Sequence, residues 1–320
     1  MQPASPLLLL LSALMMPMPL LAATGDAGSA TAIDEPLEEV IITALEPRYV
    51  EATRRDRIGR IWAPVYINDQ GPFRLVLDTG ASHTVVMPSV ASALNLSPNQ
   101  NSTVMLRGVT GSAVIPTINV KSLRVGDLLL TGKRLPIVTD ALGGAEGVLG
   151  TEGLADKRVH IDFRRDLIMI TRSHKDEHAP EGFITIPVKF SHGNLLTVDA
   201  RIGSVRLKAI IDTGGEATIA NLATRDALAR RLRDEPRIGE ITGATAHVEK
   251  AEGYATPPVE IGDILIRSPQ VSFGDLKIFH HWKLTSEPAI LIGMDVLGQL
   301  DTLIIDYQRA ELQVKMRSGR

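Results

Sequence analysis

Short alternating or apolar runs, separated by Gly, Asp, Asn and Pro, fill the chain from residue 61 onward. Runs of this kind, bounded by turn-forming residues, are typical of β-strands. The clearest are FRLVL, TINVKSLRVGDLLL, RVHIDF and DLIMIT in the first half, and FITIPVKF, VRLKAII, VEIGDILI and TLIIDY in the second. The pattern therefore predicts an all-β protein.

Two stretches are instead predicted to be helices. The first is Pro88–Leu96 and the second is Leu222–Leu232. In the second stretch, Leu222, Leu228 and Leu232 form an apolar face together with two alanines. Helices are therefore a minor part of the predicted fold.

The tripeptide Asp-Thr-Gly occurs twice, beginning at Asp78 and at Asp212, each time after an apolar run. Each copy is followed, in the same order, by a Thr-Gly turn, a Val/Ile-Gly-Asp turn, an apolar-apolar-Gly sequence and an Ile-Asp-aromatic sequence. These end at residues 111, 127, 150 and 163 in the first half, and at 243, 263, 293 and 307 in the second. A turn shared by chance would not bring four further landmarks with it, so the sequence predicts a duplicated domain.

The duplication suggests how the chain is divided. We expect a first lobe over residues 58–172 and a second over residues 183–316, joined by the polar linker 173–182. Residues 24–57 are small, polar and charged, and we interpret them as an N-terminal extension.

Residues 1–23 differ from the rest of the chain. Leu7–Leu21 is an apolar run of signal-peptide length, and Ala22 and Ala23 follow it. The run is short for a membrane-spanning helix and contains two prolines. We expect cleavage near Ala23 and export to a periplasm or the exterior, without stable membrane insertion afterwards. An uncleaved anchor, or a wrong start codon, is the alternative.

Composition narrows the choice of function. The 320-residue chain is 44% hydrophobic and carries a formal net charge of −3, so it can bury a core and lacks the basic footprint of a nucleic-acid-binding protein. It contains no cysteine. Disulfides, thiolate catalysis and cysteine-based zinc sites are therefore excluded.

The repeated aspartates offer a chemical reason for the duplication. Two lobes related by a pseudo-two-fold axis would bring Asp78 and Asp212 face to face. Two carboxylates about 4 Å apart repel by roughly 4 kcal/mol at an effective dielectric constant near 20, which is enough for the pair to share one proton. One acid and one base would then flank a water, the arrangement that peptide-bond hydrolysis requires.

Each half resembles a retroviral-type aspartic protease domain. The sequences FRLVLDTGASHTVV (73–86) and LKAIIDTGGEATIA (207–220) are similar to the catalytic loop of that family. GVLGTEGLADKRVHIDF (147–163) and AILIGMDVLGQLDTLIIDY (289–307) are similar to its second signature. The resemblance implies a bilobal aspartic-protease fold with two β-barrel-like lobes, as in exported bacterial enzymes that fuse both halves in one chain.

The resemblance also implies roles for individual residues. Asp78 and Asp212 would be the catalytic pair. Supporting residues of the catalytic loops would be Thr79, Gly80, Ser82, Thr213 and Gly214, with the two threonines bonded across the pseudo-dyad. Gly150 and Gly293 would let a later strand pass close beneath each loop. Flaps around 107–112 and 239–245 would close over an extended peptide, with substrate contacts from Gly108, Thr110, Gly111, Glu216, Thr242 and Gly243.

Two departures from the family pattern concern the second loop and the flaps. Glu216 follows the second Asp-Thr-Gly-Gly, where it could hold the substrate backbone or disturb the pair of aspartates as a third carboxylate. Neither flap contains an aromatic residue. Water exclusion is expected to depend on Val109, Val114 and Ile241.

The sequence leaves three hypotheses for the function of the chain. The first is an aspartic endopeptidase that acts on peptides or proteins as a monomer, with a homodimer possible, and uses neither metal nor cofactor. The second is a peptide- or protein-binding module on the same fold with weak or no turnover. The third is a zinc peptidase built on the linker, where residues 174–178 (HKDEH) fit the H-x-x-E-H pattern. Pro180 leaves little room for the helix that such a zinc site needs, so we favour a solvated linker.

Overall fold

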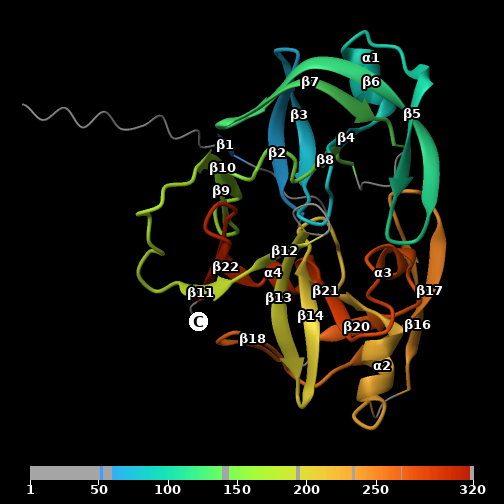
Figure 1. The fold of residues 1–320 in the computed structure, drawn as a ribbon, viewed down its shortest axis with the longest axis vertical. Coiled ribbons are helices and arrows are strands. Elements are labelled where there is room, and N and C mark those ends of the chain that lie inside the picture. Colours follow the sequence, from blue (N-terminus) through green and yellow to red (C-terminus); the bar gives the residue numbers. More distant parts are fainter. Residues whose placement is uncertain are drawn as a thin grey trace, which may run out of the picture. The chain divides into compact units, whose positions relative to one another are not determined.

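The computed structural model describes residues 51–52, 60–138, 144–191, 195–232, 235–267 and 269–317. The expected signal peptide (1–23) and almost all of the expected extension (24–57) lie outside the described residues. Strands dominate the described part, arranged as two lobes with a sheet that both share (Figure 1). The predicted all-β, bilobal fold is confirmed.

The first lobe is a seven-stranded sheet in which β3 is followed directly by Asp78. β3 pairs in parallel with β8, and β2, β6 and β5 continue the sheet in antiparallel fashion. The strands are β2 (Trp62–Ile67), β3 (Gln70–Leu77), β4 (Val85–Val86), β5 (Asn99–Arg107), β6 (Ser112–Val125), β7 (Leu128–Pro136) and β8 (Gly147–Leu149).

The second lobe repeats this arrangement around Asp212. Here β14 ends at Ile211 and pairs in parallel with β21, as β3 does with β8. The ten strands of this sheet are β12 (Lys189–Ser191), β13 (Leu195–Ile202), β14 (Val205–Ile211), β15 (Ile219–Ala220), β16 (Arg237–Thr242), β17 (Val248–Ala255), β18 (Val259–Ile261), β19 (Ile264–Ile266), β20 (Gln270–Phe273) and β21 (Ala289–Ile292).

A third sheet takes strands from both halves of the chain. Its order is β1-β10-β9-β22-β23-β11, and the antiparallel pair β9–β22 joins the first half to the second. The strands are β1 (Glu51–Ala52), β9 (Lys157–Asp162), β10 (Leu167–Arg172), β11 (Ile184–Pro187), β22 (Leu300–Asp306) and β23 (Glu311–Met316). Because every residue of β22 is buried, this sheet holds the two halves together by packing as well as by hydrogen bonds.

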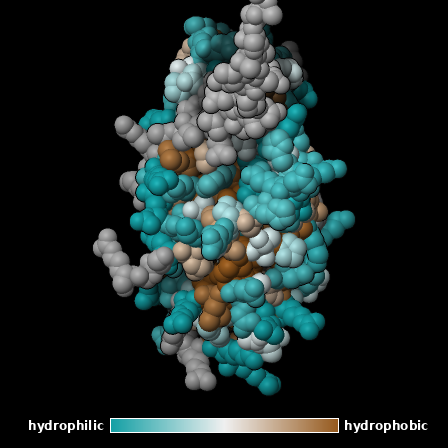
Figure 2. All heavy atoms as spheres, turned by 90° about the vertical axis from the view of Figure 1, so that its left-hand side faces the viewer, coloured by the Kyte–Doolittle hydropathy of each residue, from teal (hydrophilic) through white to brown (hydrophobic). Residues whose placement is uncertain are grey.

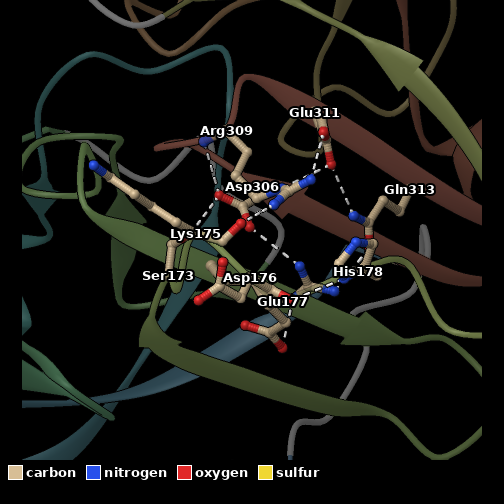
Figure 3. Close-up of polar contacts among 10 residues, drawn as sticks. Ser173, Lys175, Asp176, Glu177, His178, Asp306, Arg309, Glu311 and Gln313 are labelled. Carbon is tan, nitrogen blue, oxygen red and sulfur yellow. Dashed lines mark hydrogen bonds and ion pairs between the residues drawn. The ribbon is translucent and has the colours of Figure 1, made fainter.

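A buried ion pair attaches the linker to this shared sheet. Arg158 of β9 bonds to the carboxylate of Asp306 of β22 at 3.1 Å, and the Ser173 hydroxyl donates to the same carboxylate at 2.7 Å. Glu177 lies 3.3 Å from the Arg158 guanidinium. Figure 3 shows linker residues and residues of β22 and β23 converging on one polar cluster. The linker thus contacts both halves of the chain.

The helices are shorter than predicted. α1 (Pro88–Ala93) ends before Asn95, whose left-handed backbone (φ 54°) cannot continue a helix. α2 (Leu222–Leu228) begins at Asn221, whose side chain accepts a hydrogen bond from the Thr224 amide. At its C-terminal end the Ala229 amide bonds to the carbonyl of Asp226, three residues earlier, as in a 3₁₀-helix. Two further short helices, α3 (Lys277–His281) and α4 (Met294–Leu297), were not predicted.

One apolar run of the second half contributes to two sheets. FITIPVKF divides at Val188, so that β11 joins the shared sheet and β12 pairs with β13 of the second lobe. Pro187 has no amide hydrogen to continue a ladder, and the Val188 amide instead bonds to the Ala310 carbonyl. The run FITIPVKF is β-structure as expected, and it supplies two strands.

Apolar side chains are also found on the outer surface near the shared sheet (Figure 2). A pocket of about 270 Å³ lies between this sheet and the β18–β19 hairpin, and Ile186, Leu265 and Met316 are among its lining residues. No helix in the described part of the chain is long and apolar enough to cross a membrane.

Candidate active site

A large cleft of about 820 Å³ is lined by both lobes and contains both aspartates. Asp78 and Asp212 follow the parallel strand pairs described above. The amide of Asp78 donates to the Leu149 carbonyl at 3.0 Å, and that of Asp212 donates to the Ile292 carbonyl at 3.1 Å. Each aspartate is therefore held by the parallel partner of the strand that precedes it, β8 for Asp78 and β21 for Asp212.

Two threonines connect the loops across the lobe boundary. The amide of Thr79 donates to the Thr213 hydroxyl at 3.1 Å, and the amide of Thr213 donates to the Thr79 hydroxyl at 3.1 Å. Each hydroxyl in turn donates to a carbonyl of the opposite lobe, Thr79 to Ile211 at 2.6 Å and Thr213 to Leu77 at 2.7 Å. Four buried hydrogen bonds thus fix one loop against the other.

The glycine after each threonine lies against the aspartate of the opposite lobe. A Cβ on Gly80 would lie 3.0 Å from the Asp212 carboxyl carbon, and a Cβ on Gly214 only 2.2 Å from the Asp78 carboxyl carbon. Any side chain at Gly214 would therefore displace Asp78. This crosswise contact brings the two carboxyl groups together.

The two carboxyl groups differ in their surroundings. Burial raises the pKa of Asp78 well above its usual value, and the Asp212 carboxylate raises it further. Burial also raises the pKa of Asp212, but hydrogen bonds from Asp78 and from the amides of Gly214 and Gly215 oppose that rise. Both amides lie 3.0 Å from the same Asp212 oxygen. The Gly80 amide likewise donates to an Asp78 oxygen at 2.7 Å, so both carboxyl groups accept amide hydrogen bonds, and the rise in pKa is the larger one at Asp78.

A later glycine passes under each loop. A Cβ on Gly150 would lie 2.5 Å from the His83 carbonyl carbon, and one on Gly293 would lie 2.6 Å from the Ala217 carbonyl oxygen. Both backbones are too close for a larger residue. These contacts agree with the close passage expected of the two apolar-apolar-Gly sequences.

Comparison with known families identifies the architecture. The family model described as aspartyl protease matches residues 63–152 and 198–296, which is more than half of the chain. The chain belongs to the aspartyl protease family. The match has two segments, one in each half, as expected for two fused halves. A search of curated proteins found no match to the chain.

The flaps of this aspartyl protease meet each other at their tips. Thr110, at the β5–β6 tip, donates from its hydroxyl to the His247 carbonyl at 2.7 Å and accepts from the Gly243 amide at 3.1 Å. The Val109 carbonyl also accepts a hydrogen bond from the Ile278 amide of α3 at 3.2 Å. The first flap is thus held by the second lobe.

Because the flap tips touch, only some of the expected substrate-binding residues of the flaps line the cleft. Gly108, Thr242 and Gly243 line the cleft, whereas Thr110 and Gly111 lie where the flaps touch and not among the lining residues. Val109 and Ile241 pack against a buried cluster that includes Ile278 and Trp282. Val114 is 63% exposed and is not among the residues that line the cleft.

Ser82 and Glu216 occupy equivalent positions, four residues after the aspartate of each copy. Both line the cleft. The Ser82 hydroxyl lies 2.9 Å from Nδ1 of His83, and Glu216 is exposed. Glu216 is therefore accessible to a substrate.

Two features of the cleft were not predicted from the sequence. Arg60 is only 7% exposed, lines the cleft and lowers the pKa of Asp212. Its sequence neighbours carry no signal for that placement. α3 contributes Ile278 and, at its end, Trp282 to the wall of the cleft. The spacing of Ile278, Phe279 and Trp282 fits one helix face and could have revealed it. His280 and His281 also lie in this helix.

The linker motif does not form a metal site. Glu177 pairs with Arg158, and Nδ1 of His178 lies 2.8 Å from the Asp176 carbonyl. The segment contains turns and no helix. Among the described residues, no group of three or more His, Asp or Glu side chains is arranged to hold a metal ion.

Proposed function

We propose that this protein is an aspartic endopeptidase in which one chain supplies both catalytic aspartates. The observation that carries the proposal is the crosswise arrangement of the loops, with Gly80 against Asp212 and Gly214 against Asp78. It makes each half of the site depend on the other. A catalytic role for the loops would explain why the chain carries the motif twice.

The unequal surroundings of the carboxyl groups suggest their roles. Asp212, ionised, would take a proton from a water as that water attacks the peptide carbonyl carbon. Asp78 would give its proton to the carbonyl oxygen, which yields a tetrahedral diol. In the second step Asp212 would protonate the leaving nitrogen, and Asp78 would recover its proton from a diol hydroxyl as the C–N bond breaks. The aspartates end in their starting state.

The substrate would be an extended peptide or a protein segment. The cleft passes between the catalytic loops and two β-hairpins, whose backbones can pair with a peptide strand. One chain can perform this reaction as a monomer. The apolar run Leu7–Leu21 supports export, followed by action in the periplasm or outside the cell.

Cleavage of a diverse peptide pool by the purified full chain tests the proposal. Wild type, Asp212→Asn and the control Asp263→Asn, which changes an exposed turn carboxylate, are compared by mass spectrometry. We expect cleavage by wild type and by the control, unaffected by a chelator, and none by Asp212→Asn. Cleavage by Asp212→Asn would refute the proposal. Binding of peptides without cleavage by wild type would indicate the binding module instead.

A further inference from the structure

We propose that the cleft has an electrical polarity that selects substrates, so that it prefers a peptide with acidic side chains over the first lobe and basic side chains over the second. This inference rests on the proposed function and specifies its substrate class. It is carried by four exposed charged side chains that line the cleft outside the two Asp-Thr-Gly triplets: Arg107, Arg134, Glu216 and Glu240.

The walls nearest the aspartates are apolar on both sides. On the first lobe, Val76, Val85 and Val148 line the cleft and belong to one small buried cluster. On the second lobe, Leu195, Ile219 and Trp282 do the same in a larger cluster. These walls suit apolar side chains next to the scissile bond. They leave discrimination by charge to positions farther along the peptide.

The basic half of the cleft is formed by Arg107 and Arg134. Arg107 ends β5 just before the first flap tip, and Arg134 lies on β7. Both side chains are exposed. Arg134 donates to the Ser102 hydroxyl at 3.3 Å, and neither arginine forms an ion pair with any described residue. Two positive charges therefore face the cleft without a carboxylate to neutralise them.

The acidic half is formed by Glu216 and Glu240. Glu216 lies on the floor, in the second catalytic loop, and Glu240 lies on β16 in the second flap. Both are exposed, and neither forms an ion pair within the described part of the chain. The position equivalent to Glu216 in the first loop is the neutral Ser82. His83 and His281, one on each side, also line the cleft and do not remove this difference.

Opposite charges on the two lobes of a cleft orient a charged peptide. An exposed ion pair changes affinity by about two- to fivefold, and clefts focus the field beyond that of a flat surface. A peptide whose charges are opposite to those of both lobes forms two favourable interactions, whereas the reversed peptide meets two repulsive ones. We therefore expect a preference of about tenfold or more between matched and reversed peptides at low ionic strength, decreasing as salt is added.

Paired peptides test this polarity. They share the same apolar residues at the scissile bond and carry Asp two to four residues to one side and Lys on the other, or the reverse. We measure kcat/KM with wild type and Kd with Asp212→Asn, which retains the cleft. We expect one orientation to be preferred about tenfold in both measurements. Equal values for the two orientations would overturn the inference while leaving the proposed function intact.

Charge variants locate the preference. Arg107→Glu/Arg134→Glu should cancel or reverse the preference for Asp at one end only, and Glu216→Gln/Glu240→Gln should do so for Lys at the other. Arg206→Glu and Glu181→Gln change exposed charges outside the cleft and should leave both preferences unchanged. Equal shifts in the control and cleft variants would contradict the assignment. If wild type cleaves no peptide and Asp212→Asn binds none, both the polarity and the proposed function fail.

Discussion

Thr79 and Thr213 bind each other across the lobe boundary, with the amide of each 3.1 Å from the hydroxyl oxygen of the other. Both side chains are buried, at 1% and 0% exposure, and each hydroxyl also donates to a carbonyl of the opposite lobe. The positions of Asp78 and Asp212 therefore depend on the pairing of the lobes and not on either lobe alone.

Removal of one of these hydroxyls should destabilise the whole protein. Thr213→Val keeps the shape but leaves the Thr79 amide and the Leu77 carbonyl without their partner. We expect the free energy of unfolding to fall by about 1–3 kcal/mol for each group left unsatisfied. Thr213→Ser keeps the hydroxyl and should lose much less. Denaturant titrations of the two variants measure the difference; equal losses would show that the hydrogen bonds contribute little.

A methyl group at Gly214 should inactivate the site without unfolding the chain. Its Cβ would lie 2.2 Å from the Asp78 carboxyl carbon, so the carboxyl must move. A displacement of about 1 Å in a reacting group costs on the order of a hundredfold in rate. We expect that loss in kcat/KM with a folded circular dichroism spectrum. The control is Gly239→Ala, since its Cβ would meet nothing within 4 Å. Full activity of Gly214→Ala would contradict the geometry.

The raised pKa of Asp78 predicts how stability depends on pH. The native state keeps the Asp78 proton to a higher pH than the unfolded chain, where aspartate titrates near 3.9. Between those two pKa values the native state binds more protons, so this residue's contribution to the free energy of unfolding decreases as pH rises. Asp78→Asn lacks that term. We expect the variant to gain stability relative to wild type from about pH 4 upward.

Denaturant titrations at several pH values give this difference directly. Asp156 and Glu311, whose pKa values are lowered by Lys157 and Arg309, act in the opposite direction in both proteins and cancel in the comparison. A constant difference between wild type and Asp78→Asn across the range would mean that Asp78 titrates normally.

The polar cluster under the linker should be important for stability. Asp306 is fully buried and pairs with Arg158, which is 5% exposed. Asp306→Ala would leave that arginine buried without its main partner, and breaking such a pair typically costs 3–5 kcal/mol. Asp199→Ala is the control, because its pair with Lys189 is exposed on both sides. Thermal unfolding should separate the two variants clearly; similar Tm values would contradict this role for Asp306.

The sequence predicted the fold because each half repeats the same strongly patterned strands around an Asp-Thr-Gly loop. Short helices were less predictable. Apolar residues continue to Leu232, but α2 ends at Leu228. The helical hydrogen-bond pattern stops there because the Ala229 amide bonds to the carbonyl of Asp226, only three residues earlier. The run FITIPVKF divides because its first part pairs with β23 and its second part with β13. Both partners are set by the tertiary fold, so the run's own residues do not indicate the division.

In the candidate site, too, some contacts could be predicted from the sequence and others could not. The threonine and glycine contacts belong to the repeated motif, so the resemblance located them. The burial of Arg60 near Asp212 and the hydrogen bonds of Thr110 to the second flap arise from contacts between distant segments. No sequence spacing encodes those contacts.

An intramolecular pair of catalytic aspartates is tested most directly by kcat/KM on one cleaved peptide for Asp78→Asn, for Asp212→Asn, and for an equimolar mixture of the two. Each variant should lose at least a thousandfold relative to wild type, because it lacks a group that acts as part of a catalytic unit. The mixture should remain as inactive as its components, because both aspartates of one site belong to one chain. Substantial activity in either variant, or its recovery on mixing, would contradict an intramolecular pair of catalytic aspartates.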